Sequence, residues 1–181
     1  MAPNPRKTRD DVLYKFTSFG EERANLRQWN LTGVDLTELD LTDDDLTGAN
    51  LENADLSHSD LRTVPLTDAN LTGANLTSTH LAGAQYHPEQ LLNTRGLNPT
   101  NNAHGIPQEV WGQILPKGPT YRAITVRLLQ DWDGTLKEAI THSYTLAPKG
   151  PETRHLLRTL LQDWDGTVQE AIAAAETLHS A

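Results

Sequence analysis

The 181-residue chain contains no cysteine, one methionine and few bulky aromatic residues, with two Phe and four Trp. Without cysteine it can form neither a disulfide nor a thiolate metal site, which fits a reducing compartment. Hydrophobic residues make up 36% of the sequence, and no stretch approaches the roughly 20 apolar residues of a membrane span. The N-terminus also lacks the apolar stretch of a secretory signal. We therefore expect a cytoplasmic protein with a thin core.

The negative charge is concentrated in one part of the chain. The formal net charge is −9, and residues 25–85 contain ten acidic and two basic residues, which gives −8 for that segment. Such a segment repels nucleic-acid phosphates and attracts basic protein surfaces. We therefore expect a protein partner, with no direct binding to nucleic acid or to membranes.

Leucine recurs at every fifth position through this acidic segment. A period of five matches neither the 3.6-residue period of a helix nor the two-residue period of a strand. The position before each leucine is mostly Asp or Asn, and the position before that is mostly small. The repeated leucines are Leu26, Leu31, Leu36, Leu41, Leu46, Leu51, Leu56, Leu61, Leu66, Leu71, Leu76 and Leu81, and Tyr86 takes the next place.

This pattern is explained by a coil whose four sides contain five residues each, with leucine pointing inward from every side. It resembles the Ala-(Asp/Asn)-Leu-x-x repeat of the pentapeptide-repeat family, through Ala49-Asn50-Leu51, Ala54-Asp55-Leu56, Ala69-Asn70-Leu71 and Ala74-Asn75-Leu76. The resemblance implies a β-solenoid plus α fold. It would be a short right-handed quadrilateral β-helix of about three coils, followed by an all-α region.

A second, longer repeat follows the leucine pattern. Residues 116–147 align with residues 148–179, and 18 of the 32 positions are identical. Each copy has apolar residues at helical spacing, so we expect two helical hairpins. Gly134 and Gly166 are expected to end the first helix of each copy.

Two features of this second repeat indicate how the hairpins are built. Thr135 with Glu138, and Thr167 with Glu170, have the spacing of a capping box that begins the second helix of each hairpin. Trp132 and Trp164 occupy equivalent positions in the two copies. They either form the hairpin cores or anchor a partner or a second copy of the chain.

These repeats divide the chain into four expected segments, the third of which begins with a short capping helix, as is common in the pentapeptide-repeat family. The segments are an N-terminal cap at 1–24, the β-helix at 25–86, a capping helix and linker at 87–107, and the helical region at 108–181.

No pattern in the sequence supports catalysis. Asp131-Trp132-Asp133-Gly134-Thr135 resembles the first motif of haloacid-dehalogenase-type phosphatases. However, it follows helix-periodic residues rather than a strand, and the remaining 46 residues are too few for such a domain. The seven histidines show no metal-ligand spacing. We therefore expect a non-enzymatic protein that needs no cofactor and no metal.

Acidic residues twenty positions apart should stack on the solenoid surface. Asp35 would lie over Asp55, and Asp40 over Asp60, about 4.8 Å apart. These four aspartates, named here the acidic face, either cap turn amides on a solvated surface or await a basic partner. An amide ladder is also expected from Asn30, Asn50 and Asn70.

One further residue departs from the repeat. Asp44 falls on an inward position that is otherwise small or apolar. An unpaired buried carboxylate is costly, so we expect a local distortion of the coil there, unless neighbouring groups hydrogen-bond it.

The sequence thus favours a protein–protein interaction module with an acidic β-helix face and an apolar helical face. The alternative is a DNA-mimicking inhibitor or protector of a gyrase or topoisomerase that acts as a homodimer through its C-terminal helices, as in bacterial pentapeptide-repeat proteins of that kind. About three coils would match only about four base pairs of duplex DNA.

Overall fold

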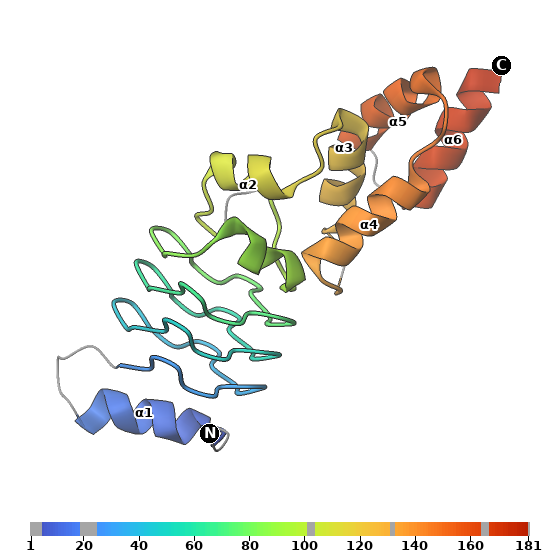
Figure 1. Ribbon diagram of the computed structural model, residues 1–181. Coiled ribbons are helices and arrows are strands. Elements are labelled where there is room, and N and C mark those ends of the chain that lie inside the picture. The colour runs from blue at the N-terminus through green and yellow to red at the C-terminus, as the bar shows by residue number, and fades with distance from the viewer. Residues whose placement is uncertain (1–4, 19–24, 101–103, 131–132, 164–166, 181) are drawn as a thin grey trace.

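The computed structural model describes residues 5–18, 25–100, 104–130, 133–163 and 167–180. Coils stack between α1 at one end and the remaining helices at the other, which gives an elongated molecule (Figure 1). The helical elements are α1 (Arg9–Ser18), the 3-10 helix η1 (Pro88–Asn93), α2 (Gln108–Ile114), α3 (Pro119–Leu128), α4 (Leu136–Leu146), α5 (Pro151–Asp163) and α6 (Val168–Ser180).

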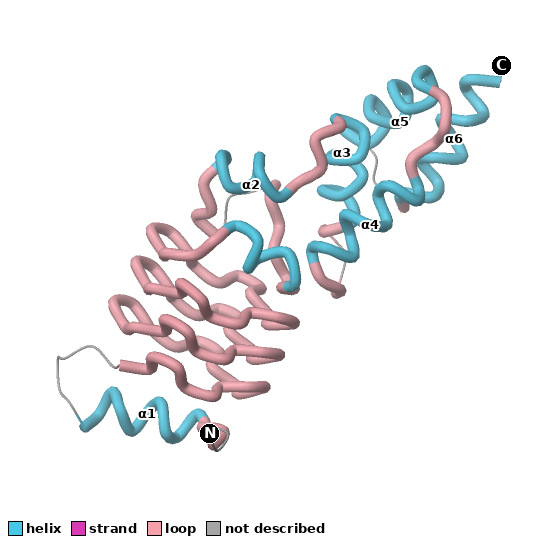
Figure 2. The backbone as a smooth tube through the Cα atoms, in the orientation of Figure 1, coloured by secondary structure: helices cyan, strands magenta, loops and turns pink. Residues whose placement is uncertain are grey.

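The leucine-repeat segment is a β-helix-like solenoid. Parallel bridges join residues twenty apart, including Asn25 with Asp45, Asn30 with Asn50, Asp35 with Asp55, and Asp40 with Asp60. Each bridge is isolated, so the coils are drawn as loops rather than as strands (Figure 2). A solenoid followed by helices was predicted from the sequence, and the structure confirms it at this level.

The leucines form the solenoid core. All twelve are at most 2% exposed, and burying one leucine side chain stabilises a fold by roughly 1.5–3 kcal/mol. The chain turns because the second residue after each leucine is left-handed, with φ between 56° and 76° in all twelve repeats. The N–H of the following residue then bonds to the leucine carbonyl in most repeats, for example Ala54 N to Leu51 O at 3.0 Å. A left-handed third residue is what a type II turn requires.

The expected distortion at Asp44 is wrong. Asp44 N bonds to Leu41 O at 3.0 Å, the same turn bond that Ala49 makes to Leu46, and the bridge between Asn25 and Asp45 follows in register. Asp44 is only 5% exposed and is not without a partner. The repeated turn geometry therefore holds the coil in register around this buried residue.

Helix α1 covers the N-terminal end of the solenoid. Val12 is fully buried in the same apolar core as the leucines. Arg6 donates from Nη2 to the Gly33 carbonyl at 3.0 Å, and Arg9 donates from Nη2 to the Thr37 carbonyl at 2.9 Å. The helix is thereby fixed to the first coil.

The other end of the solenoid is covered by η1 and the chain that follows it. Gly73 N bonds to Asn93 O, Leu76 N to Arg95 O, and Leu81 N to His104 O, at 2.7–2.9 Å. Leu97 and Ile106 are 1% exposed in the leucine core. Most of the described chain between Asn93 and Ile106, where the sequence predicts a linker, thus lies against the last coil. The division into four segments stays a prediction.

The two 32-residue copies form the hairpins α3–α4 and α5–α6, as predicted. Thr135 and Glu138 make both bonds of a capping box at the start of α4, and Thr167 and Glu170 make the same bonds before α6. Helix α3 ends at Leu128, before Gly134, so the predicted end of this helix is too late; Gly166 lies outside the described residues.

The first hairpin, α3–α4, packs against the C-terminal end of the solenoid. Leu136 N bonds to Thr94 O at 3.0 Å, and Arg95 bridges Thr135. Leu136 and Ala139 belong to the core that begins at Val12. One apolar core therefore runs from α1 through the coils into α4. No helix in the described parts of the chain has the length and apolar character needed to cross a membrane.

Candidate interaction surface

Asp or Asn before each leucine caps the next turn. In nearly every repeat the side-chain Oδ1 accepts the N–H two residues later, as Asp40 does from Thr42 at 3.0 Å and Asp55 from Ser57 at 2.9 Å. These are Asx turns, which Asp and Asn serve equally well. Turn capping accounts for the residue type at this position, but it does not require a negative charge.

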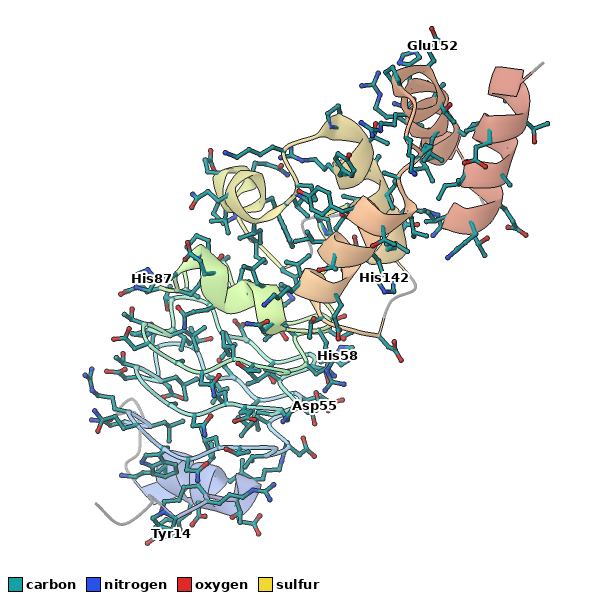
Figure 3. The ribbon with its side chains drawn as sticks, turned by 45° about the vertical axis from the view of Figure 1, so that its right-hand side comes forward. Tyr14, Asp55, His58, His87, His142 and Glu152 are labelled. Atoms are coloured by element: carbon teal, nitrogen blue, oxygen red, sulfur yellow. The ribbon has the colours of Figure 1, made fainter. Side chains whose placement is uncertain are left out.

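The acidic face occupies two adjacent sides of the lower coils. Asp35 bridges Asp55 on one side, and Asp40 bridges Asp60 on the next. Figure 3 shows Asp55 and His58 on the same edge of the stack. These two sides, residues 34–43 and 54–63, contain six of the ten acidic residues of the solenoid and one arginine.

Two of these six acidic residues were missed in the sequence reasoning. Glu38 is exposed and Asp43 partly exposed, and both take the left-handed turn position, two residues after a leucine. An acid count at this position as well as before the leucine would have found them, because both positions recur in every five-residue repeat.

Arginines of the chain itself engage part of the face. Arg9 Nη1 lies 3.0 Å from Asp35 Oδ1, and Arg62 Nη2 lies 2.6 Å from Asp60 Oδ2. The pKa of Asp35 is lowered chiefly by bonds from Thr37, and that of Asp60 chiefly by bonds from Arg62. Both carboxylates are therefore held in the charged form, each beside a cation.

Asp55 and Asp40 are placed differently. Burial raises the pKa of Asp55, but hydrogen bonds from Ser57 and Asn75 outweigh it, so the pKa is lowered overall. Asp40 is exposed, and its carboxylate accepts a hydrogen bond from the Thr42 amide. Within the described residues neither forms an ion pair like those of Asp35 and Asp60, so both carboxylates contribute to the net negative charge of the face.

The amide ladder forms in part. Asn70 Nδ2 donates to Asn50 Oδ1 at 3.0 Å, as predicted. Asn50 Nδ2 instead donates to Thr32 Oγ1 at 3.0 Å, and that hydroxyl donates to Asn30 Oδ1 at 2.8 Å. The Thr32 hydroxyl thus connects Asn50 to Asn30.

The structure describes only part of the apolar helical face that the sequence predicts. Trp132 and Trp164 lie outside the described residues, so their role as core or anchor stays a prediction. Leu178 on α6 is 57% exposed, and Tyr144 on α4 is 54% exposed beside Tyr121, with ring centroids 4.6 Å apart. Across the described ranges, no group of three His, Asp or Glu side chains could hold a metal ion.

The leucine-repeat segment is similar to known proteins. Residues 45–83 match the pentapeptide repeats family in eight copies. Among solved structures, the chain is similar to a pentapeptide repeat protein from Nostoc PCC 7120, with 29% identity over 44% of this chain and 64% of that one and a TM-score of 0.40. It is also similar to HetL, a pentapeptide repeat protein involved in heterocyst differentiation regulation in Nostoc, with 27% identity over 45% and 33% and a TM-score of 0.41.

A third similar structure is a pentapeptide repeat protein from the thylakoid lumen of Arabidopsis thaliana. The identity is 21% over 64% of this chain and 90% of that one, with a TM-score of 0.26. The chain spans less than two thirds of the length of either Nostoc protein. No curated protein matches the chain in sequence.

Proposed function

We propose that this pentapeptide-repeat protein is a non-enzymatic interaction module whose acidic face, formed by Asp35, Asp40, Asp55 and Asp60, binds a basic surface of a partner protein. Pentapeptide-repeat proteins are generally interaction modules without catalytic activity. The observation that supports this function is the stacking of the four aspartates on two adjacent sides of one rigid solenoid. A fixed array of like charges raises the local concentration of an oppositely charged partner and speeds association.

The same proposal includes the handedness and number of coils, the cellular location and the oligomeric state. The solenoid is a right-handed quadrilateral β-helix of about three coils, and the bacterial protein acts in the cytoplasm. Its C-terminal helices join two copies into a homodimer, for which Leu178, 57% exposed on α6, supplies apolar area. Light scattering tests this part: the proposal expects a dimer mass, and a Leu178→Glu variant should be monomeric. A monomeric wild-type chain would contradict it.

A second candidate is a DNA mimic that inhibits or protects gyrase. The acid content of the solenoid favours it, because DNA-binding enzymes present basic surfaces. The length opposes it, since three coils at about 4.8 Å extend over roughly four base pairs, and only end-to-end dimers would lengthen the rod. A gyrase supercoiling assay distinguishes the candidates: mimicry requires an effect at micromolar protein, and the first proposal expects none.

Affinity capture with matched variants tests the acidic face. In the test variant, all four aspartates become Asn, which keeps the Asx turns because Asn already fills this position in other repeats, such as Asn50 and Asn70. The control removes the same charge elsewhere, with the substitutions Asp45→Asn, Glu52→Gln, Asp68→Asn and Glu89→Gln.

The proposal expects at least one protein to be retained by the wild type and the control variant and lost with the test variant. Identical capture by all three baits would refute a role for the acidic face.

A further inference from the structure

A groove with a volume of about 400 Å³ lies between α3 and α5. These helices come from the two copies of the 32-residue repeat and pack against each other (Figure 1). Three arginines line the groove: Arg122 and Arg127 from α3, and Arg158 from α5. Among the described residues that line it, none is acidic.

The three guanidinium groups are oriented by contacts within the chain. Arg122 Nε donates to the Pro116 carbonyl at 3.3 Å, Arg127 Nη1 donates to Gln130 Oε1 at 2.7 Å, and Arg158 Nη2 lies 3.1 Å from His155 Nδ1. A guanidinium has five N–H donors and stays charged at all ordinary pH values. Each of these contacts uses one N–H and restricts the side chain. Arg127 has a further partner, so Arg122 and Arg158 are the oriented cationic donors on which the site depends.

The groove also has an apolar wall. Ala123 and Val126 from α3 and Leu161 from α5 line it together with the arginines. A bare inorganic ion would leave this wall without a partner, whereas a ligand with a hydrocarbon part would bury it. Small-molecule sites typically combine such apolar lining with a few placed polar groups, in volumes of roughly 300–1,000 Å³.

We propose that this groove binds a small organic anion, in which a carboxylate or phosphate group is attached to an apolar aromatic or aliphatic body. The acid group accepts hydrogen bonds from Arg122 and Arg158, and the body packs on Val126 and Leu161. Guanidinium groups pair with carboxylate and phosphate through two parallel hydrogen bonds. This site is separate from the acidic face and does not depend on its partner.

The sequence repeat supplies a matched control for one arginine. Arg154 is the equivalent of Arg122 in the second copy, thirty-two residues later, and its Nε donates to the Pro148 carbonyl at 2.6 Å. Both arginines therefore make the same bond to the proline six residues earlier. Arg122 lines the groove and Arg154 does not. Substituting each by Gln separates the loss of this local bond from the loss of the site.

Amide chemical shifts of the full chain test the site, with phenyl phosphate and benzoate as the probes. At least one probe should bind saturably with a Kd near or below about 1 mM, and the shifts should map to α3 and α5. Phenol, which lacks the acid group, and inorganic phosphate, which lacks the body, should bind at least about tenfold more weakly, the factor expected for one lost charge-assisted contact or apolar contact.

The variants give the decisive comparison. Arg122→Gln and Arg158→Gln should each weaken probe binding by about tenfold or more, and Arg154→Gln should leave it unchanged. If Arg158→Gln fails to fold, Arg158→Lys keeps the charge but loses the planar fork, and it should still weaken binding.

Four results would overturn the proposal. They are the absence of saturable binding for both probes, equal binding of phenol or of inorganic phosphate, equal effects of Arg122→Gln and Arg154→Gln, and shifts that map away from α3 and α5. Self-association that Arg158→Gln abolishes would show that an acidic segment of a second copy fills the groove instead.

Discussion

Thr63 Oγ1 donates a hydrogen bond to Asp43 Oδ1 at 2.9 Å, across two residues that are twenty positions apart and both left-handed, with φ of 64° and 70°. The bond joins equivalent turns of successive coils. Left-handed backbone is unfavourable for a β-branched residue such as threonine, so this turn stores strain.

Replacing Thr63 by Asn should therefore stabilise the protein. Asn tolerates left-handed φ better than threonine and can still donate to Asp43, so we expect the free energy of unfolding to rise by about 1 kcal/mol. Urea unfolding followed by circular dichroism measures it. An unchanged or lower midpoint would show that the turn at Thr63 is not strained.

The leucine core should be sensitive to truncation. Leu56 is fully buried in the middle coil, so Leu56→Ala should lower the free energy of unfolding by about 2–5 kcal/mol, because it leaves a cavity that the coils above and below cannot fill. The control is Thr72→Ala, at an exposed position beside a repeated leucine, which should change stability by less than about 0.5 kcal/mol. Equal effects at the two positions would contradict the coil geometry.

Stability should fall in mild acid because of His104. This side chain is 3% exposed, with Nδ1 3.0 Å from the Thr79 carbonyl and Nε2 accepting from the Asn98 amide at 3.3 Å. Burial lowers the pKa of His104 below its ordinary value of 6.5, and His80 adds to the decrease. The unfolded chain therefore takes up this proton first as the pH falls.

The contribution of His104 is thus complete above pH 6.5 and is lost as the pH falls from 6.5 through the folded-state pKa. The urea midpoint should decrease between about pH 7 and about pH 5, and His104→Gln should remove part of that decrease. A variant with the full wild-type slope would exclude His104 as its source.

Two substitutions of Asp55 distinguish the effect of its turn-capping hydrogen bonds from the effect of its negative charge. Its Oδ1 accepts from the Ser57 amide, the Ser57 hydroxyl and Asn75 Nδ2 at 2.7–3.0 Å. Asp55→Ala should cost about 1 kcal/mol through these lost bonds, whereas Asp55→Asn keeps an acceptor oxygen and should cost less. Thermal unfolding of both variants checks this. Equal losses in the two variants would mean that the negative charge, which both variants lack, is what holds the coil.

Much of the solenoid could be predicted because its signal is local and repeated. Twelve leucines in register specify which side chain points inward, and the twenty-residue coil follows from them. Asp44 shows the limit of that reasoning. A single charge was expected to disturb the coil, but the turn bond from Asp44 N to Leu41 O is the same as in the neighbouring repeats, and Asp44 is not without a partner.

Contacts between the repeats could not be predicted, because no periodic signal encodes them. The bond from Leu136 to Thr94 joins the start of α4 to the chain that covers the last coil, forty-two residues earlier, and it depends on how the first hairpin packs. The groove between Arg122 and Arg158 arises in the same way from the packing of α3 on α5. Their spacing in the sequence gives no indication that they converge.

The most direct test of the account is the affinity of the captured partner as a function of ionic strength, measured by calorimetry. The wild type and the control variant should bind with a Kd that rises steeply with salt, because the contact is between charged surfaces. The variant with all four face aspartates replaced by Asn should bind at least about tenfold more weakly at low salt and show a flatter salt dependence. Equal affinity and equal salt dependence for the three proteins would contradict the claim that the acidic face is the binding surface.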